Sequence, residues 1–195
     1  MQKRLIILIL CIHSFFSFSQ DFSYGAKFGT VLGGLITDRS GMNLRVSAQI
    51  GGEAEWRWNN LSFQPELMYS RQGEIERDQG ARIDNTLKLD YIIMPLMGKY
   101  YFNEGFYAEA GPQVGYLLYA NYRRQEGSFR EVTDERDNYR NFDLSANLGI
   151  GYLTEWGFSI GLRYSMGTFN ILRNPTENTT SQRNSVYQFY MGMRF

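Results

Sequence analysis

Residues 44–58 read LRVSAQIGGEAEWRW, and their apolar and polar side chains alternate along the whole stretch. Even positions carry Leu44, Val46, Ala48, Ile50, Gly52, Ala54, Trp56 and Trp58, and odd positions carry Arg45, Ser47, Gln49, Gly51, Glu53, Glu55 and Arg57. Successive side chains of a β-strand point to opposite faces of its sheet. The stretch therefore predicts a strand with one apolar and one polar face.

The same period of two recurs along the rest of the chain. It is clear in 106–122, 142–152, 158–166 and 186–195, and noisier in about 22–36, 61–72 and 87–102. No segment shows the spacing of an amphipathic helix. Together with 44–58, these segments predict eight strands and an all-β fold.

A soluble β-sandwich shows the same alternation as a transmembrane β-barrel. The lengths of the strands and links must therefore distinguish these two folds. The predicted strands have about 10–16 residues, against about 5–6 in globular sheets and about 9–11 in tilted membrane-spanning strands. Short links at 59–60, 103–105 and 155–157 alternate with long links at about 37–43, 73–85, 123–141 and 173–185. Short turns on one side and long loops on the other are typical of outer-membrane barrels.

The aromatic residues agree with a barrel that crosses a membrane. The three tryptophans, Trp56, Trp58 and Trp156, lie beside short links, while Tyr69, Tyr119, Tyr122 and Tyr164 lie toward the long links. Such barrels carry one aromatic girdle at each membrane interface.

We therefore predict an eight-stranded antiparallel transmembrane β-barrel over residues 20–195, located in the cell outer membrane. The sheet must close because an open edge cannot be hydrogen-bonded in lipid. An even number of strands places both termini on one side, which we expect to be the periplasm. The long loops then face outside.

Residues 1–19 are predicted to be a signal peptide that is cleaved. Lys3 and Arg4 supply its positive start, an apolar run follows, and small residues precede the cut. A membrane anchor is the alternative, but the run is shorter than the ~18–20 apolar residues of a spanning helix. Lipid attachment at Cys11 is disfavoured by the bulky residue before it.

Composition excludes most enzyme classes. The chain has one cysteine and one histidine, and both Cys11 and His13 lie in the predicted leader. The mature chain therefore has no disulfide, cysteine nucleophile, histidine base, or zinc site built from these residues. Glu53 and Glu55 point the same way, as paired acids would, but no nucleophile motif accompanies them. We expect a non-enzyme without cofactor or metal, and the balanced charge gives no basis for nucleic-acid binding.

Three segments resemble the PorT-like family of outer-membrane β-barrels. FQPELMYSRQG at 63–73 is similar to its third strand, LDYIIMPLMGKYYF at 89–102 to its fourth, and YAEAGPQVGY at 107–116 to its fifth. Ile93 departs from the family pattern, which usually has an acidic residue there. The resemblance implies an eight-stranded outer-membrane barrel of a Gram-negative bacterium. One named member serves a protein-secretion system, so a component of a secretion apparatus is one implied function.

The polar face is expected to form a charge network inside the barrel. Its predicted members are Lys27, Arg45, Glu53, Glu55, Arg57, Glu66, Lys99, Glu109, Asp143, Arg163 and Arg194. These groups could line a polar conduit, or they could pair into a core that plugs the barrel. Charges in a confined interior need partners, and an eight-stranded barrel leaves little room, so we favour the plug.

The loop from 123 to 140 carries five arginines among five acidic residues. It could grip lipopolysaccharide phosphates or a protein partner, or it could be a solvated mixed-charge loop. Asp134, Glu135 and Asp137 lack the spacing of a calcium loop.

The last strand is expected to be the assembly signal for the barrel-insertion machinery. Its lipid-facing residues are Tyr187, Phe189, Met191, Met193 and Phe195. The sequence favours a structural or binding barrel that acts through its outer loops, with outer-membrane lipid and lipopolysaccharide as partners. A narrow channel and a secretion component remain the alternatives.

Overall fold

The computed structural model describes residues 21–37, 45–78, 83–126, 129–173 and 182–195. The predicted leader lies outside them. The strands are β1 (Asp21–Thr37), β2 (Arg45–Trp58), β3 (Leu61–Asp78), β4 (Ile83–Tyr101), β5 (Phe106–Glu126), β6 (Phe129–Asp134), β7 (Phe142–Leu153), β8 (Phe158–Gly167) and β9 (Gln182–Arg194), with one 3-10 turn, η1 (Arg136–Asn138). No helix among the described residues is long and apolar enough to cross a membrane.

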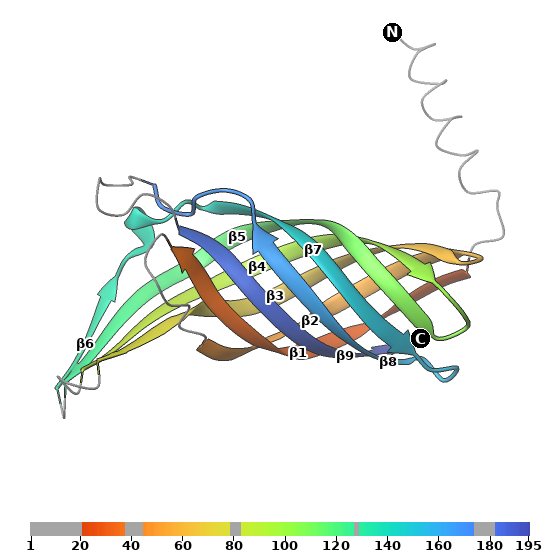
Figure 1. The fold of residues 1–195 in the computed structure, drawn as a ribbon, viewed down its shortest axis with the longest axis horizontal. Coiled ribbons are helices and arrows are strands. Elements are labelled where there is room, and N and C mark those ends of the chain that lie inside the picture. Colours follow the sequence, from red (N-terminus) through yellow and green to blue (C-terminus); the bar gives the residue numbers. More distant parts are fainter. Residues whose placement is uncertain (1–20, 38–44, 79–82, 127–128, 174–181) are drawn as a thin grey trace, which may run out of the picture.

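Eight of these strands close into a barrel, which confirms the predicted fold (Figure 1). The order around the wall is β1, β2, β3, β4, β5, β7, β8, β9 and back to β1, and every neighbouring pair is antiparallel. Pairing of β4 with β5 and of β1 with β9 leaves no strand of the ring with an open side in the membrane.

The ninth strand, β6, corrects the prediction of one long loop over 123–141. β5 runs on to Glu126, and β6 turns back to pair with it from Asn121 to Glu126. β3, β4 and β5 have 18, 19 and 21 residues, whereas β7 and β8 have 12 and 10. The surplus lies beyond the barrel, where β3, β4, β5 and β6 form a sheet that we call the protruding sheet (Figure 1). Mixed charge concealed its alternation in the sequence.

The two ends of the barrel differ in their connections. At the end that we call the short-turn end, β2 meets β3 through Asn59 and Asn60, and Asn59 adopts a φ of 52°. Asparagine tolerates this left-handed conformation, which tight hairpins require. β1 and the C-terminus meet at the same end, since Tyr24 and Phe195 exchange backbone hydrogen bonds of 3.2 and 2.8 Å. The opposite end is called the long-loop end.

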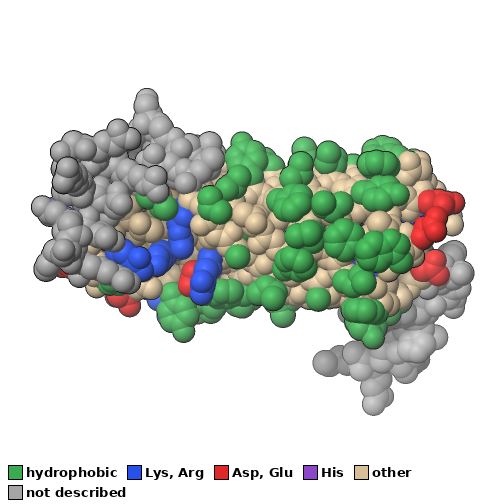
Figure 2. All heavy atoms as spheres, turned by 90° about the horizontal axis from the view of Figure 1, so that it is seen from below, with side chains coloured by type: hydrophobic (Ala, Val, Ile, Leu, Met, Phe, Trp, Pro, Cys, Tyr) green, Lys and Arg blue, Asp and Glu red, His purple; other side chains and the backbone are tan. Residues whose placement is uncertain are grey.

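The wall separates polar from apolar side chains in the predicted direction. Odd residues of β2 such as Glu53 and Glu55 are buried inside, while Ile50 on the other face is 63% exposed. Leu148 on β7 is 67% exposed in the same way. Apolar side chains are spread over the wall between its two ends (Figure 2). An apolar outer wall suits lipid, whereas a soluble barrel would show the reverse arrangement.

A β-bulge changes the faces of β5 near the long-loop end. Tyr91 pairs with Leu117, but Asp90 pairs with Tyr119, so Leu118 is an extra residue. Tyr119 is consequently 61% exposed, and Ala120 is buried. Simple alternation predicts Asn121 on the inner face. The bulge reverses this, because one extra residue exchanges the two faces of a strand.

Candidate functional site

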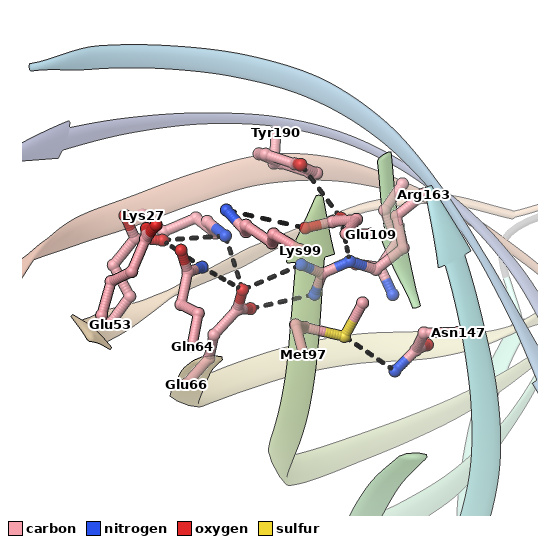
Figure 3. Close-up of polar contacts among 12 residues, drawn as sticks. Lys27, Glu53, Gln64, Glu66, Met97, Lys99, Glu109, Asn147, Arg163 and Tyr190 are labelled. Atoms are coloured by element: carbon pink, nitrogen blue, oxygen red, sulfur yellow. Dashed lines mark hydrogen bonds and ion pairs between the residues drawn. The ribbon is translucent and has the colours of Figure 1, made fainter. Parts of the chain in front are cut away.

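Glu66 on β3 lies at the centre of the lumen. Its carboxylate accepts hydrogen bonds from Lys27 Nζ at 2.6 Å and from Arg163 Nη1 and Nη2 at 2.9 and 2.8 Å. Gln64 donates to the same carboxylate at 2.7 Å (Figure 3). One acid thus joins strands β1, β3 and β8 across the interior.

A second part of the network lies toward the short-turn end. Glu53 is 2.8 Å from both Lys27 Nζ and Arg194 Nε. Arg194 also pairs with Glu55, whose carboxylate accepts a 2.7 Å hydrogen bond from the Tyr101 hydroxyl. Glu53 and Glu55 therefore neutralise buried cations and do not form a pair of acids facing a substrate.

The third part surrounds Glu109 on β5. Arg163 Nε and the Tyr190 hydroxyl donate to Glu109 at 2.8 and 3.0 Å. Lys99 lies 3.7 Å from the same carboxylate and 4.2 Å from the centre of the Tyr107 ring. The Tyr107 and Tyr190 hydroxyls are 3.0 Å apart, so the network continues from strand to strand around the wall.

These contacts make a single network, which we call the charge core. Its ionic members are the cations Lys27, Lys99, Arg163 and Arg194 and the carboxylates Glu53, Glu55, Glu66 and Glu109. Every one of them is at most 9% exposed. Removing charges from water is costly unless each finds a partner, and the numbers of positive and negative groups here are equal. The arrangement suits a plug better than a water-filled conduit.

Three predicted members of the network make no ion pair with the charge core in the described part of the chain. Arg57 is at the short-turn mouth, where its Nε donates to the Asn59 carbonyl at 3.1 Å and its guanidinium lies 3.8 Å from the centre of the Tyr101 ring. Asp143 is buried nearer the long-loop end and accepts a 2.8 Å hydrogen bond from Asn184. Arg45 lies at the long-loop end and donates to the Gln72 carbonyl at 2.6 Å. Charge and alternation in the sequence predict the inner face for these three residues, but they do not predict the height of each residue along the barrel axis.

Sequence reasoning missed the uncharged members of the charge core. Gln64, Tyr107 and Tyr190 bridge its carboxylates and cations, yet none was predicted as part of it. A signal was present, since Tyr190 lies on the same face of its strand as Gln188, Gly192 and Arg194.

The lumen nearer the long-loop end has a different filling, which we call the apolar core. Its members are Met68, Leu87, Leu89, Tyr91, Ile93, Leu117, Ala120, Tyr139 and Ile171. Tyr139 and Ile171 come from segments outside the strands. Tyr139 forms a β-bridge with Leu172, and Arg140 N–H donates to the Ile171 carbonyl at 2.7 Å. Two connecting segments thus close over this half of the lumen.

Glycines on the inner face do not leave an open lane. A Cβ on Gly151 would lie 2.5 Å from the Tyr107 hydroxyl, and one on Gly161 would lie 2.4 Å from the Tyr190 hydroxyl. The two tyrosine rings occupy the space that these glycines provide. Small residues here make room for large partners.

The remaining predicted residues lie on the surface. Tyr187, Phe189, Met193 and Phe195 are exposed on the outer wall, and Met191 between them is partly buried. Within the described part of the 123–140 loop, Arg136 approaches the Tyr116 hydroxyl at 3.5 Å. The described residues contain no group of three or more His, Cys, Asp or Glu side chains that could hold a metal ion.

Comparison with known proteins agrees with this geometry. Residues 18–173 match a family model described as outer membrane protein beta-barrel domain. The chain belongs to this family. No curated protein sequence matches it.

Solved structures show the same barrel in other members of the outer-membrane class. The crystal structure of Neisserial surface protein A is similar with a TM-score of 0.58 at 13% identity, covering 91% of this chain and 100% of that one. The attachment invasion locus protein Ail of Yersinia pestis has a TM-score of 0.54 at 12% identity, covering 90% and 99%. At such low identity the likeness shows the fold alone. The family match places this barrel in the outer membrane.

Proposed function

We propose that this protein is a non-catalytic outer-membrane barrel that binds a partner through the protruding sheet, with its long-loop end outside the cell and both termini in the periplasm. The observation that carries the proposal is the outer edge of β6. Among the described residues, β6 pairs with β5 and with no other strand. Glu131, Val132, Thr133 and Asp134 are all exposed. An unpaired strand edge can hydrogen-bond an added strand of another protein.

The backbone geometry identifies which groups a partner strand would meet. Glu135 N–H donates to the Ala120 carbonyl at 2.9 Å, in the same register that pairs Thr133 with Tyr122. Because bonding direction alternates along an antiparallel strand, Thr133 and Glu131 bond to β5. Val132 and Asp134 then direct their N–H groups toward the open edge.

Site-specific photocrosslinking in intact cells tests this proposal. A photoreactive residue at position 132 should form adducts with a protein, whereas one at Trp156, in a short turn, should not form them with the same protein. Val132→Pro removes an edge N–H and should abolish the adduct formed from a probe at position 134. Val132→Thr keeps the N–H and should preserve it. Equal labelling of the proline and threonine variants would contradict binding through the edge.

The barrel wall and the last strand suggest two further partners. The exposed apolar wall would contact outer-membrane lipid, including lipopolysaccharide. The outward residues of β9 would be read by the barrel-insertion machinery, together with the terminal Phe195, whose side chain is 73% exposed. Deleting Phe195 should leave the chain in the periplasm for degradation. Normal insertion of the truncated chain would contradict the role of this residue.

A role in a secretion apparatus is the second candidate. It is favoured by the PorT-like motifs at 63–73, 89–102 and 107–116, which lie on β3, β4 and β5, the strands that also build the protruding sheet. Deleting the gene and assaying export of surface proteins tests this candidate. Loss of export, restored by the wild-type protein but not by Val132→Pro, would join the two candidates into one function.

A further inference from the structure

The outer wall carries two charged residues near the long-loop end, Arg71 on β3 and Asp90 on β4. We call this charged site the Arg71 notch. Two rows of paired residues cross the wall there. The lower row runs Phe28, Ile50, Tyr69, Ile92 and Tyr116 and is apolar or aromatic. In the row above it, Arg71 pairs with Asp90, and Asp90 pairs with Tyr119. Two charged residues opposite each other on a lipid-facing wall call for an explanation, because lipid does not solvate charged side chains.

The position of Arg71 along the barrel fits the edge of the membrane. Phe63, eight positions earlier on β3, stacks with Trp56 at 6.3 Å between ring centres, in the aromatic girdle of the short-turn end. With a rise of ~3.3 Å per residue and a strand tilt of ~40°, Arg71 lies about 20 Å farther along the barrel axis. The apolar band of such barrels is about 25 Å tall. The backbone of Arg71 therefore lies about 5 Å inside the upper edge of this band, and its long side chain can extend from there toward the lipid phosphates of the outer leaflet.

A groove in the wall leads up to Arg71. It has a volume of about 400 Å³ and is lined by Phe28, Gly29, Ala48, Gln49, Ile50, Tyr69 and Arg71. Two of its lining residues, Gly29 and Ala48, are small. Apart from Arg71 and the Tyr69 hydroxyl at its upper end and the nearly buried Gln49, the lining is apolar. This mainly apolar lining, with Arg71 at one end, suits an acyl chain that carries an anionic head group.

The guanidinium of Arg71 contacts Tyr69 on one side and is open on the other. Tyr69 donates a 2.9 Å hydrogen bond to Asp90 and lies 3.4 Å from Arg71 Nε. Arg71 is exposed, and its two terminal nitrogens make no hydrogen bond or ion pair with the described residues. Arg45 lies close enough to Asp90, Arg71 and Arg123 for their charges to interact with its own. Among these four side chains, three are cationic and only Asp90 is anionic.

From these observations, we propose that the Arg71 notch and the groove below it bind a phosphorylated acyl glycolipid of the lipopolysaccharide class. Arg71 would hold a phosphate with its two terminal nitrogens, and one acyl chain would lie in the groove over Ala48. Arginine matches phosphate geometry through paired hydrogen bonds. The site rests on the proposed contact of the wall with lipopolysaccharide and is independent of the β6 edge.

The charge distribution at this end of the wall favours an anionic lipid over a neutral one. Basic side chains gather on the wall beside the long-loop end, with an acidic side chain next to them, while the rest of this face is mainly apolar or uncharged as far as the acidic side chains at the short-turn end (Figure 2). Free phosphate could use Arg71 alone but would gain nothing from the groove. A lipid uses both, so it is the ligand that the combined site fits.

Native mass spectrometry of the purified barrel in detergent micelles tests the proposal with rough lipopolysaccharide as the probe. The wild-type protein should retain the lipid, and removal of the lipid phosphates should weaken retention about tenfold or more. Arg71→Ala should weaken it by a similar factor and should make binding insensitive to the phosphates. Ala48→Trp, which fills the groove but keeps the charge, should weaken binding of both forms of the lipid.

Arg183→Gln is the matched control, because Arg183 is also exposed at the long-loop end but lies on β9. It should retain lipid as the wild type does. Heat-dependent migration in gels would verify that each variant is folded, and the comparison of the two lipids on wild-type protein needs no variant. Retention by Arg71→Ala equal to wild type, or equal retention of dephosphorylated lipid, would overturn the site. Displacement by millimolar inorganic phosphate would overturn it in favour of a simple anion site. Absence of any lipid on wild-type protein would instead overturn the lipopolysaccharide contact as a whole.

Discussion

The lumen near the short turns and the lumen near the long loops are filled by different chemistry. The first holds the charge core, in which Glu66 joins Lys27 and Arg163 across the barrel. The second holds the apolar core, capped by Tyr139 and Ile171. Both halves are filled with large side chains, but the first is organised by pairing of charges and the second by apolar packing.

This difference decides how each half responds to substitution. A buried ion pair that loses one partner leaves an uncompensated charge, and the cost is large. An apolar core that loses methyl groups is left with a cavity, and the cost follows the volume removed. The same barrel therefore offers two independent ways to test what fills it.

Glu66→Ala should have the largest effect. It leaves Lys27 and Arg163 without the carboxylate that both contact, so the free energy of unfolding should fall by about 3–5 kcal/mol. Urea titration of the refolded barrel in phospholipid vesicles measures this. Glu131→Ala on exposed β6 removes the same group from the surface and should change it by less than about 0.5 kcal/mol. A loss from Glu66→Ala as small as that of the control would contradict a plug held by charge.

Leu89→Ala tests the apolar half in the same titration. Leu89 is fully buried among Met68, Tyr91 and Leu117, so the truncation should lower the free energy of unfolding by about 2–4 kcal/mol. Val132→Ala, which truncates an exposed side chain of β6, should cost less than about 0.5 kcal/mol. If Leu89→Ala behaves like that control, this half of the lumen is not a packed core.

Gly151→Ala tests the contact between glycine and tyrosine in the charge core. Its new Cβ would lie 2.5 Å from the Tyr107 hydroxyl, so the ring must move, at a cost of about 1–3 kcal/mol. Gly98→Ala is the matched control, because its nearest neighbouring atom is 3.6 Å away. The vesicle titration should separate the two variants, and equal stability would show that Tyr107 does not depend on this space.

Conductance tests whether both halves are sealed. In a planar bilayer the wild-type protein should show no steady unitary current, because the charge core and the apolar core each fill the lumen. Tyr139→Ala removes part of the cap over the apolar core only, and it should also remain non-conducting. Steady currents from the wild type would overturn the plug and favour the channel. Currents from Tyr139→Ala alone would show that only the apolar half seals.

Trypsin digestion of intact cells should identify which end of the barrel faces outside the cell. Cleavage is expected near Arg130 or Arg136, and the short turn at Trp156 should be spared. Mass spectrometry of the released peptides reports the sites. Cleavage confined to the short-turn end would invert the barrel and exchange the positions that we propose for its two cores.

The period of two along the chain is enough to predict much of this protein's architecture. Alternation along 44–58 places Glu53 and Glu55 inside and Ile50 outside, because a strand has only two faces. Link lengths indicate a membrane barrel, since short and long connections must gather at opposite ends. The same alternation predicts the inner face for the charged residues that make up the charge core.

The height of each residue along the barrel, and the partners that it meets there, depend on the closed fold. Arg57 and Asp143 share the inner face with Glu66 but lie at other heights along the barrel axis. Height depends on strand tilt and register, and the sequence of a single strand determines neither. The bulge at Leu118 and the pairing of β6 likewise depend on neighbouring strands. The groove below Arg71 arises in the same way, since Phe28, Ala48 and Arg71 come from three strands. Alternation fixes which way a side chain points, whereas closure of the barrel decides its partners.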